Sequence, residues 1–306
     1  MAAPGTPRDI LLLLMLAGSW GGSFVLIKLS VATLPPLTMT AIRLFLAALV
    51  LGAVARAFGH RFPTDWRTWR FYLLFALFGT VVPFSLIAFG EIRIDSAMAA
   101  ILIAAVPLAT HALSHFFVAG ERLGGVTVVG VLIGFGGVVV LFGPGALAGL
   151  GSELIGQLAV LAATVSYAIS NVLASRIRHL PPMVNGAATL VAASVWALPA
   201  SLIVDRPWTL DPSTTSMLAL LMLTLISTAA ANLIYFLLMT SAGPSFLSLT
   251  NFLVPLLGVF WSWLFLAERP GWEALAALIL ILIGIAVVRH GRRRVQSPSP
   301  STSAIE

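Results

Sequence analysis

Long apolar stretches separated by short polar breaks fill almost the whole chain. A helix needs about 20 mostly apolar residues to cross the hydrocarbon core of a membrane, and ten such stretches can be drawn along the 306 residues. The predicted spans are Ile10–Leu29, Leu37–Ala57, Trp69–Gly90, Ser96–Val118, Leu123–Phe142, Leu154–Ser175, Met183–Val204, Thr214–Thr240, Phe246–Ala267 and Trp272–Val288. The pattern predicts an all-α polytopic membrane protein.

The second five stretches repeat the first five. The proline pair Pro35-Pro36 opens one stretch, and Pro181-Pro182 opens its counterpart 146 positions later. Pro107 aligns with Pro255 at a shift of 148. An odd number of crossings in each copy places the second copy upside down, and inverted repeats of this kind enclose a substrate site near the bilayer midplane. The predicted units are a first five-helix repeat at 8–143, an inverted second repeat at 153–290 and a disordered cytoplasmic tail at 291–306.

Basic residues collect on one side of these spans. With the N-terminus in the cytoplasm, 12 of the 17 Lys and Arg residues lie inside, three lie outside, and Lys28 and Arg43 lie within spans. Cytoplasmic segments of membrane proteins are enriched in Lys and Arg, so we expect both termini in the cytoplasm. The pair Glu121-Arg122 then lies inside and its repeat mate Glu268-Arg269 outside, as inverted copies require. The net charge of +6 is explained without a nucleic-acid partner.

Composition excludes several classes of protein. Hydrophobic residues make up 59% of the chain and charged residues 9%, against roughly 25% charged residues in soluble domains. No cysteine is present, which excludes disulfides, thiol catalysis and thiolate metal sites. The HExxH motif of zinc proteases is also missing. We expect no enzyme activity, cofactor or metal site, and we retain a channel and a membrane-embedded enzyme as alternatives to a carrier.

Short motifs recur at matching places in the two halves. The first half contains Trp20-Gly21-Gly22-Ser23-Phe24, then the run 41–48 with Arg43 in it, and later Pro107 and Glu121. The second half contains Tyr167-Ala168-Ile169-Ser170-Asn171, Pro255 and Glu268. On these motifs, residues 8 to 290 resemble the drug/metabolite transporter superfamily with two EamA-type repeats. The resemblance implies a basket of ten helices around a central cavity lined by spans one to four and six to nine. It extends to bacterial exporters of amino acids, aromatic ones included.

Amides inside the spans are the first candidates for substrate binding. Polar groups within a bilayer usually face a cavity or a partner helix. Asn171, Asn232 and Asn251 lie in spans six, eight and nine. An amide both donates and accepts hydrogen bonds, so these side chains suit the carboxylate or amine of an amino acid. Hydrogen bonding between helices is the alternative interpretation.

Aromatic side chains form the second group of binding candidates. They are suited to enclosing an apolar substrate side chain, and their faces attract an ammonium group; helix packing or lipid contact is the alternative. Ser23 belongs to the same motif as two of them and completes the predicted binding set. The aromatic candidates are Trp20, Phe24, Phe84, Tyr167 and Tyr235.

Ionisable residues within spans are candidates for gating and coupling. Arg43 lies about 12 Å into its span by helix rise and needs a polar partner, in either the cavity or a gate. Lys28 is expected to snorkel to the outer interface. His111 and His115 share a helix face, but a zinc site normally has a third protein ligand. Packing is therefore the first interpretation for His111, with proton coupling or substrate contact as the second.

Two prolines and the acidic residues complete the set. Pro107 and Pro255 are expected to interrupt equivalent helices and free a backbone carbonyl beside the site. None of the 11 acidic residues lies at mid-span, and Glu91 belongs near a span end. Proton-driven carriers often use a buried carboxylate. Because none is expected here, substrate exchange and facilitated movement are retained as alternatives to proton antiport.

These observations predict a secondary transporter that works by alternating access in the bacterial inner membrane. Its expected partners are the lipid bilayer and a small molecule, an amino acid or a related metabolite, moved outward. A transporter of another metabolite or drug class in the same superfamily is the alternative. The sequence leaves the driving force, the exact substrate, the net direction and the oligomeric state open.

Overall fold

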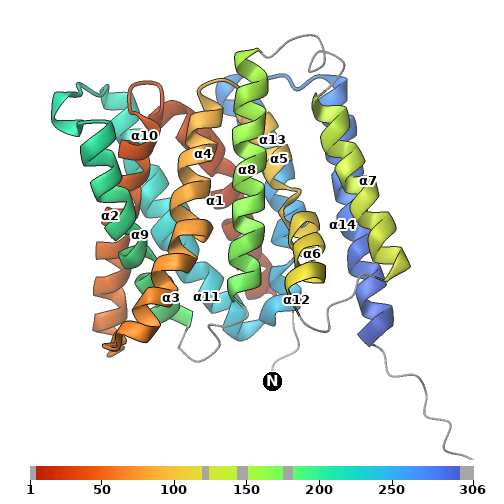
Figure 1. Cartoon of the computed structure of the whole chain (residues 1–306), viewed down its shortest axis with the longest axis horizontal. Helices are drawn as coiled ribbons and strands as arrows, with labels where there is room; N and C mark the ends of the chain where they lie inside the picture. The colour runs from red at the N-terminus through yellow and green to blue at the C-terminus, as the bar shows by residue number, and fades with distance from the viewer. Residues whose placement is uncertain (1–4, 119–123, 143–150, 175–181, 297–306) are drawn as a thin grey trace, which may run out of the picture.

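The computed structural model describes residues 5–118, 124–142, 151–174 and 182–296, which form a bundle of helices running up and down (Figure 1). Within these ranges, ten helical stretches are long and apolar enough to cross a membrane. The spans in chain order are α1 (Pro7–Ser30); α2 (Pro36–Ala57); α3, η1 and α4 (Trp66–Ala76, Leu77–Val81, Val82–Glu91); α5 and α6 (Ser96–Ile103, Val106–Phe117); α7 (Gly125–Phe142); α8 (Ser152–Ala174); α9 (Pro182–Val204); α10, η4 and α11 (Thr214–Thr224, Leu225–Ala230, Ala231–Ser241); α12 and α13 (Gly243–Leu247, Thr250–Leu266); and α14 (Trp272–Gln296). The predicted fold class is confirmed. Outside the described residues lie Glu121-Arg122, Arg176 and Arg178, whose arginines are counted among the 12 cytoplasmic basic residues, and positions 297–306 of the predicted tail.

Local chemistry sets where the helices begin. Pro36 and Pro182 are the first residues of α2 and α9, where the N–H that proline lacks would have no partner within the helix. Thr6 and Asp9 form a capping box at α1: the Thr6 hydroxyl accepts from Asp9 N, and the Asp9 carboxylate accepts from Thr6 N. Both satisfy N–H groups at the start of the helix. The proline pairs of the repeat therefore mark helix starts.

The main contacts between spans each have an equivalent contact in which the two halves have swapped places. α1 packs on α13, and α8 packs on α6, which pairs span one with nine and span six with four. α4 packs on α8 as α11 packs on α1, while α2 with α9 and α7 with α14 join equivalent spans. A contact set that survives exchange of the halves indicates a pseudo-two-fold axis, which for inverted repeats lies in the membrane plane.

Close backbone packing joins α7 and α14 at one edge of the bundle (Figure 1). A Cβ atom on Gly130 would lie 2.8 Å from Gly284 O, and one on Gly137 would lie 2.8 Å from Ala277 O. At the repeat shift of 147, Gly130 corresponds to Ala277 and Gly137 to Gly284. Each contact is therefore the image of the other, as across a two-fold axis, and small residues let the two backbones meet.

Four spans depart from a continuous α-helix at repeat-related places. η1 and η4 are π-helices that begin at Leu77 and Leu225, 148 residues apart. Span four breaks between α5 and α6, with Pro107 in the first turn of α6, as predicted. Span nine breaks between α12 and α13, whereas Pro255 lies inside the continuous helix α13. The expectation that Pro255 interrupts its helix is wrong, because α13 tolerates the loss of the one bond that Asn251 C=O would receive.

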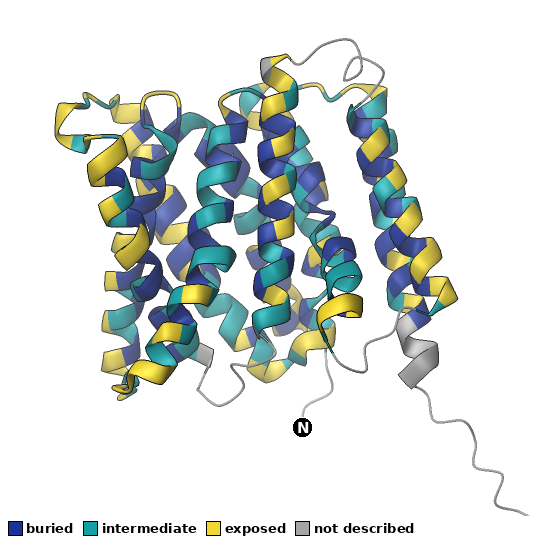
Figure 2. Cartoon of the chain, in the orientation of Figure 1, coloured by how far each residue is buried: buried dark blue, intermediate teal, exposed yellow. Residues whose placement is uncertain are grey.

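Exposed residues lie mainly on the outer faces and at the ends of the bundle (Figure 2). Large apolar side chains there include Leu132, Val139 and Trp263, which are 66%, 71% and 53% exposed. Such faces suit contact with lipid. Trp66, Trp208 and Trp272 are exposed near span ends, where tryptophans form interfacial belts.

Candidate functional site

A cavity of about 840 Å³ lies within the bundle, lined by every span except α7 and α14. We call the side where α1 begins and α14 ends the terminal side, and the other the distal side. The lining reaches from Ile27 and Ile87, in the distal halves of their spans, to Met239 and Pro244 beside the α11–α12 turn on the terminal side. The distal lining residues Ile27 and Ile87 are buried, whereas Asn171 and Asn251, in the terminal halves of their spans, are exposed, so the cavity is more accessible from the terminal side.

The structure brings the predicted binding residues together around this cavity. Arg43, Pro107 and Pro255 also line it, whereas His111 and His115 are not among the lining residues. Among the described residues, no group of three or more His, Asp or Glu side chains is arranged to hold a metal ion. The predicted binding residues in the lining are Trp20, Ser23, Phe24, Phe84, Tyr167, Asn171, Asn232, Tyr235 and Asn251.

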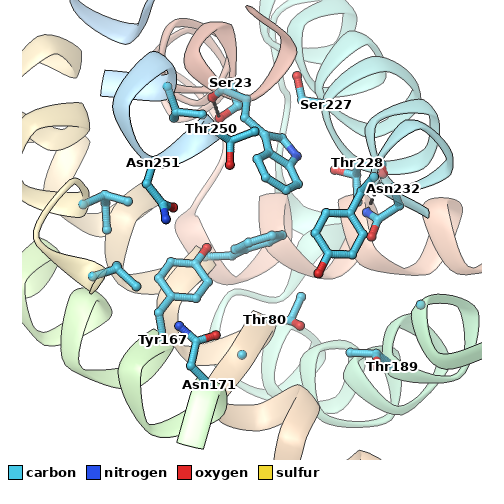
Figure 3. A pocket seen from close by; sticks show the side chains of 18 of the residues that line it. Ser23, Thr80, Tyr167, Asn171, Thr189, Ser227, Thr228, Asn232, Thr250 and Asn251 are labelled. Atoms are coloured by element: carbon cyan, nitrogen blue, oxygen red, sulfur yellow. Dashed lines mark hydrogen bonds between the residues drawn. The ribbon is translucent and has the colours of Figure 1, made fainter. Parts of the chain in front are cut away.

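Amides occupy opposite walls, with Asn171 and Asn251 on one side and Asn232 on the other (Figure 3). Asn232 Nδ2 donates to Thr228 O at 2.6 Å, and Asn171 Nδ2 donates to Thr110 Oγ1 at 3.1 Å. Each bond uses one of the two N–H donors of the amide. The second donor and the amide oxygen are left to meet a ligand.

Aromatic rings supply the apolar part of the wall. The ring centroids of Trp20 and Tyr235, from α1 and α11, are 6.0 Å apart and their planes are tilted by 37°. Tyr167 faces the cavity from α8 between Asn171 and Asn251 (Figure 3). Neutral polar groups and rings therefore alternate around the space, an arrangement that suits an amphipathic ligand.

Arg43 is the cation in the cavity wall and is only 4% exposed. Its Nε donates to Thr228 Oγ1 at 2.7 Å, which supplies the polar partner that its depth requires. Its Cζ lies 4.0 Å from the centroid of the Phe84 ring, within the range of a cation–π interaction. The side chains of α2, α4 and η4 thus hold the guanidinium in place.

Several lining residues were missed by sequence reasoning. Thr80 and Thr228 come from the two π-helices, structures that frequently occur at functional sites. They are 148 residues apart, so the repeat register contained a signal for this pair. Tyr72 donates a hydrogen bond from its hydroxyl to Asn185 Oδ1 between α3 and α9. The missed polar lining residues are Tyr72, Thr80, Asn185, Thr189, Ser227, Thr228, Ser248 and Thr250.

Hydrogen bonds between spans join the distal ends of the bundle. Lys28 Nζ donates to Glu91 O at 2.6 Å and to Ile94 O at 2.7 Å, joining α1 to the end of α4. Lys28 thus bonds carbonyls at the end of span three, and its snorkelling to the outer interface stays a prediction. The Glu268 carboxylate accepts from Ser96 N at 3.0 Å and from a second backbone N–H of the same turn at 2.9 Å, tying the end of α13 to the start of α5.

Glu91 departs from the sequence-based expectation. It is the last residue of α4, near a span end as expected, yet its side chain is 0% exposed. Ser96 Oγ donates to Glu91 Oε2 at 3.3 Å, and Oε1 has no hydrogen-bond partner. The protein therefore does contain a buried carboxyl group, because α1 and α5 cover the end of α4.

Comparison with known proteins gives a consistent result across the chain. The sequence profile of the EamA-like transporter family matches residues 8–143 and 154–289. The uncharacterized inner membrane transporter YedA of Escherichia coli K12 is 28% identical over 88% of this chain and 84% of its own length. The uncharacterized transporter YvbV of Bacillus subtilis is 29% identical over 92% and 91%. One solved protein structure, 24% identical, has a TM-score of 0.65 and covers 96% of this chain and 100% of the other.

Proposed function

Because the chain belongs to the EamA-like transporter family, we propose that it exports amino acids, aromatic and hydrophobic ones included, by alternating access. The observation that carries this proposal is the central cavity, in which amides and aromatic rings line one space between two inverted halves. Its volume of about 840 Å³ lies within the usual range for small-molecule sites, roughly 300 to 1,000 Å³. Rings suit the side chain of the substrate, and amides suit its charged groups.

Loading from the cytoplasm follows from the proposed orientation. Arg61, in the loop between α2 and α3, and Arg67, in the first turn of α3, lie on the terminal side. Cytoplasmic segments are enriched in such residues, so the terminal side and both termini are assigned to the cytoplasm of a bacterial inner membrane. A cavity that is accessible from the terminal side then accepts substrate from inside, and separation of the distal hydrogen bonds releases it outside.

The driving force has two candidates, substrate exchange and proton antiport. A buried carboxyl group is the usual proton carrier in such proteins, and Glu91 supplies one beside the distal contacts. Exchange needs no such group. The two mechanisms differ in whether a pH gradient alone drives uphill flux.

Purified protein in liposomes tests the proposal directly. We expect saturable counterflow of amino acids such as phenylalanine and leucine, measured with and without an imposed pH gradient, and none in liposomes without protein. Saturable flux of sugars or nucleotide sugars without amino-acid flux would reject the substrate class. Flux that does not saturate would indicate a channel instead of a carrier.

A further inference from the structure

We infer that Arg43 is the anion anchor of the cavity, and that the transported molecule carries a carboxylate or another singly charged oxyanion which binds this guanidinium. The inference rests on the proposed function in taking the cavity as the transport site. It adds a chemical requirement that the amides and rings do not impose, because those groups would also accept neutral and cationic molecules.

Burial without an acidic partner is the first observation. Arg43 is 4% exposed, and among the described residues no carboxylate lies within 4.0 Å to form an ion pair with it. Its hydrogen bond to Thr228 is with a neutral hydroxyl group. A buried charge is costly unless it is paired, so the described state holds a cation whose balancing charge is missing from the wall.

The buried acid Glu91 does not fill that role. It lies at the distal end of α4, where Ser96 donates to its carboxylate, and no ion pair within 4.0 Å joins it to Arg43. Glu91 does not line the cavity, whereas Arg43 does. The position beside Arg43 within the cavity is therefore available to an anion that enters with the substrate.

The bonding groups of Arg43 determine what it can hold. Nε is engaged by Thr228, and the Phe84 ring lies against the guanidinium. The two terminal nitrogens then remain as a planar pair of donors, which matches the two oxygens of a carboxylate. Arginine also keeps its charge at neutral pH, so this preference does not depend on a proton.

One anchor implies one anionic group. At the shift of 146 set by the proline pairs of these two spans, the mate of Arg43 is Thr189, which lines the cavity without a charge. Arg43 bonds Thr228, which lies one turn before Asn232, and the opposite wall presents the amides Asn171 and Asn251 (Figure 3). A carboxylate held at Arg43 would therefore direct the rest of the molecule, ammonium group and side chain, toward amides and rings.

Three ligands that differ in one group test the anchor: phenylalanine, phenylalaninamide without the carboxylate, and 3-phenylpropionate without the ammonium group. Binding is measured on purified full-length protein by competition and by ligand-induced thermal shift. We expect the wild type to bind the amide at least about tenfold more weakly than phenylalanine, as expected for a lost hydrogen bond to a charged group. Arg43→Gln should weaken the two carboxylates by about 10- to 100-fold and leave the amide unchanged.

Matched variants separate anchoring from folding. Arg56→Gln removes an exposed arginine from the same helix, outside the cavity, and should leave all three affinities unchanged. Thr228→Val removes the hydroxyl that holds Nε and should lower the preference for carboxylates even if Arg43→Gln fails to fold. An equal loss for the amide and the carboxylates, or an unchanged preference in folded variants, would overturn the inference.

A wider panel separates this inference from the proposed function. Arg43-dependent binding of another anionic metabolite, without any amino-acid binding, would uphold the anchor and reject amino-acid export. Amino-acid transport that is unchanged by replacing Arg43 would uphold amino-acid export and reject the anchor. A wild type that binds phenylalaninamide and phenylalanine equally well would reject the anchor whichever substrate is transported.

Discussion

Asn171 and Asn232 occupy opposite walls of the cavity, and each already donates one hydrogen bond to the protein. That first bond orients the amide, so the remaining donor and the oxygen would meet a substrate in a fixed direction. An oriented neutral group pays less entropy on binding than a mobile one. The two residues are therefore expected to contribute more to affinity than to the fold.

Replacing either amide by alanine tests its role. Asn171→Ala or Asn232→Ala should raise the KM of transport by roughly 5- to 10-fold, as expected for one lost hydrogen bond, with membrane insertion unchanged. Thr240→Ala, an exposed position outside the lining, serves as the control. Unchanged kinetics in both amide variants would remove them from the site.

Sequence reasoning identified the amides because asparagine is conspicuous in an apolar span. Threonine is not conspicuous, because its hydroxyl commonly bonds a carbonyl of its own helix, and Thr80 and Thr228 were missed for that reason. Glu91 was assigned to a span end correctly, but its burial depends on how α1 and α5 cover that end. The burial of a residue depends on which neighbouring spans pack against it, and the hydropathy of its own span does not predict that packing.

Helix interruptions define the cavity at the scale of elements. The broken spans four and nine and the π-helices of spans three and eight all contribute lining residues. The break at Pro107 was predictable because proline has no N–H. The π-helices and the break before α13 have no comparable marker, since a π-turn needs no special residue type. Hydropathy therefore located the spans but not the irregular turns within them.

The reciprocal glycine contact gives a test at the same scale. Gly284→Val should lower the melting temperature in detergent by roughly 2 to 10 °C, because its Cβ would lie 2.6 Å from Gly130 O. Gly136→Val is the matched control, since no heavy atom lies within 4 Å of a Cβ there. Equal melting temperatures for the two variants would contradict the close packing of α7 and α14.

Two inverted halves around one cavity make the whole molecule a candidate for alternating access. Inverted repeats imply two related states, in which the cavity opens toward opposite sides. In the described state the cavity is more accessible from the terminal side, and hydrogen bonds join spans at the distal end. The orientation in the membrane and the existence of the second state can be tested together.

The natural chain has no cysteine, so single cysteines can be introduced without a background of labelling. Thr64→Cys, on the terminal side, should react with a membrane-impermeant maleimide only in inverted vesicles, and Thr209→Cys, on the distal side, only in intact cells. Ile27→Cys, at the distal end of the cavity lining, should react in both preparations if the carrier alternates. Labelling of Ile27→Cys from one side alone would argue against alternation, while reversed labelling of the two loop controls would reverse the orientation.

The charge of Arg43 has a consequence for the energy of the cycle in a polarised membrane. A cavity open to one aqueous phase takes on the electrical potential of that phase, so alternation moves Arg43 across most of the field without moving it through space. One elementary charge in a potential of 100 mV corresponds to about 2.3 kcal/mol. A bacterial membrane that is negative inside would therefore hold the empty carrier toward the cytoplasm. A zwitterionic substrate adds no net charge. The same voltage would therefore set which side the empty carrier faces, but it would not drive the net flux.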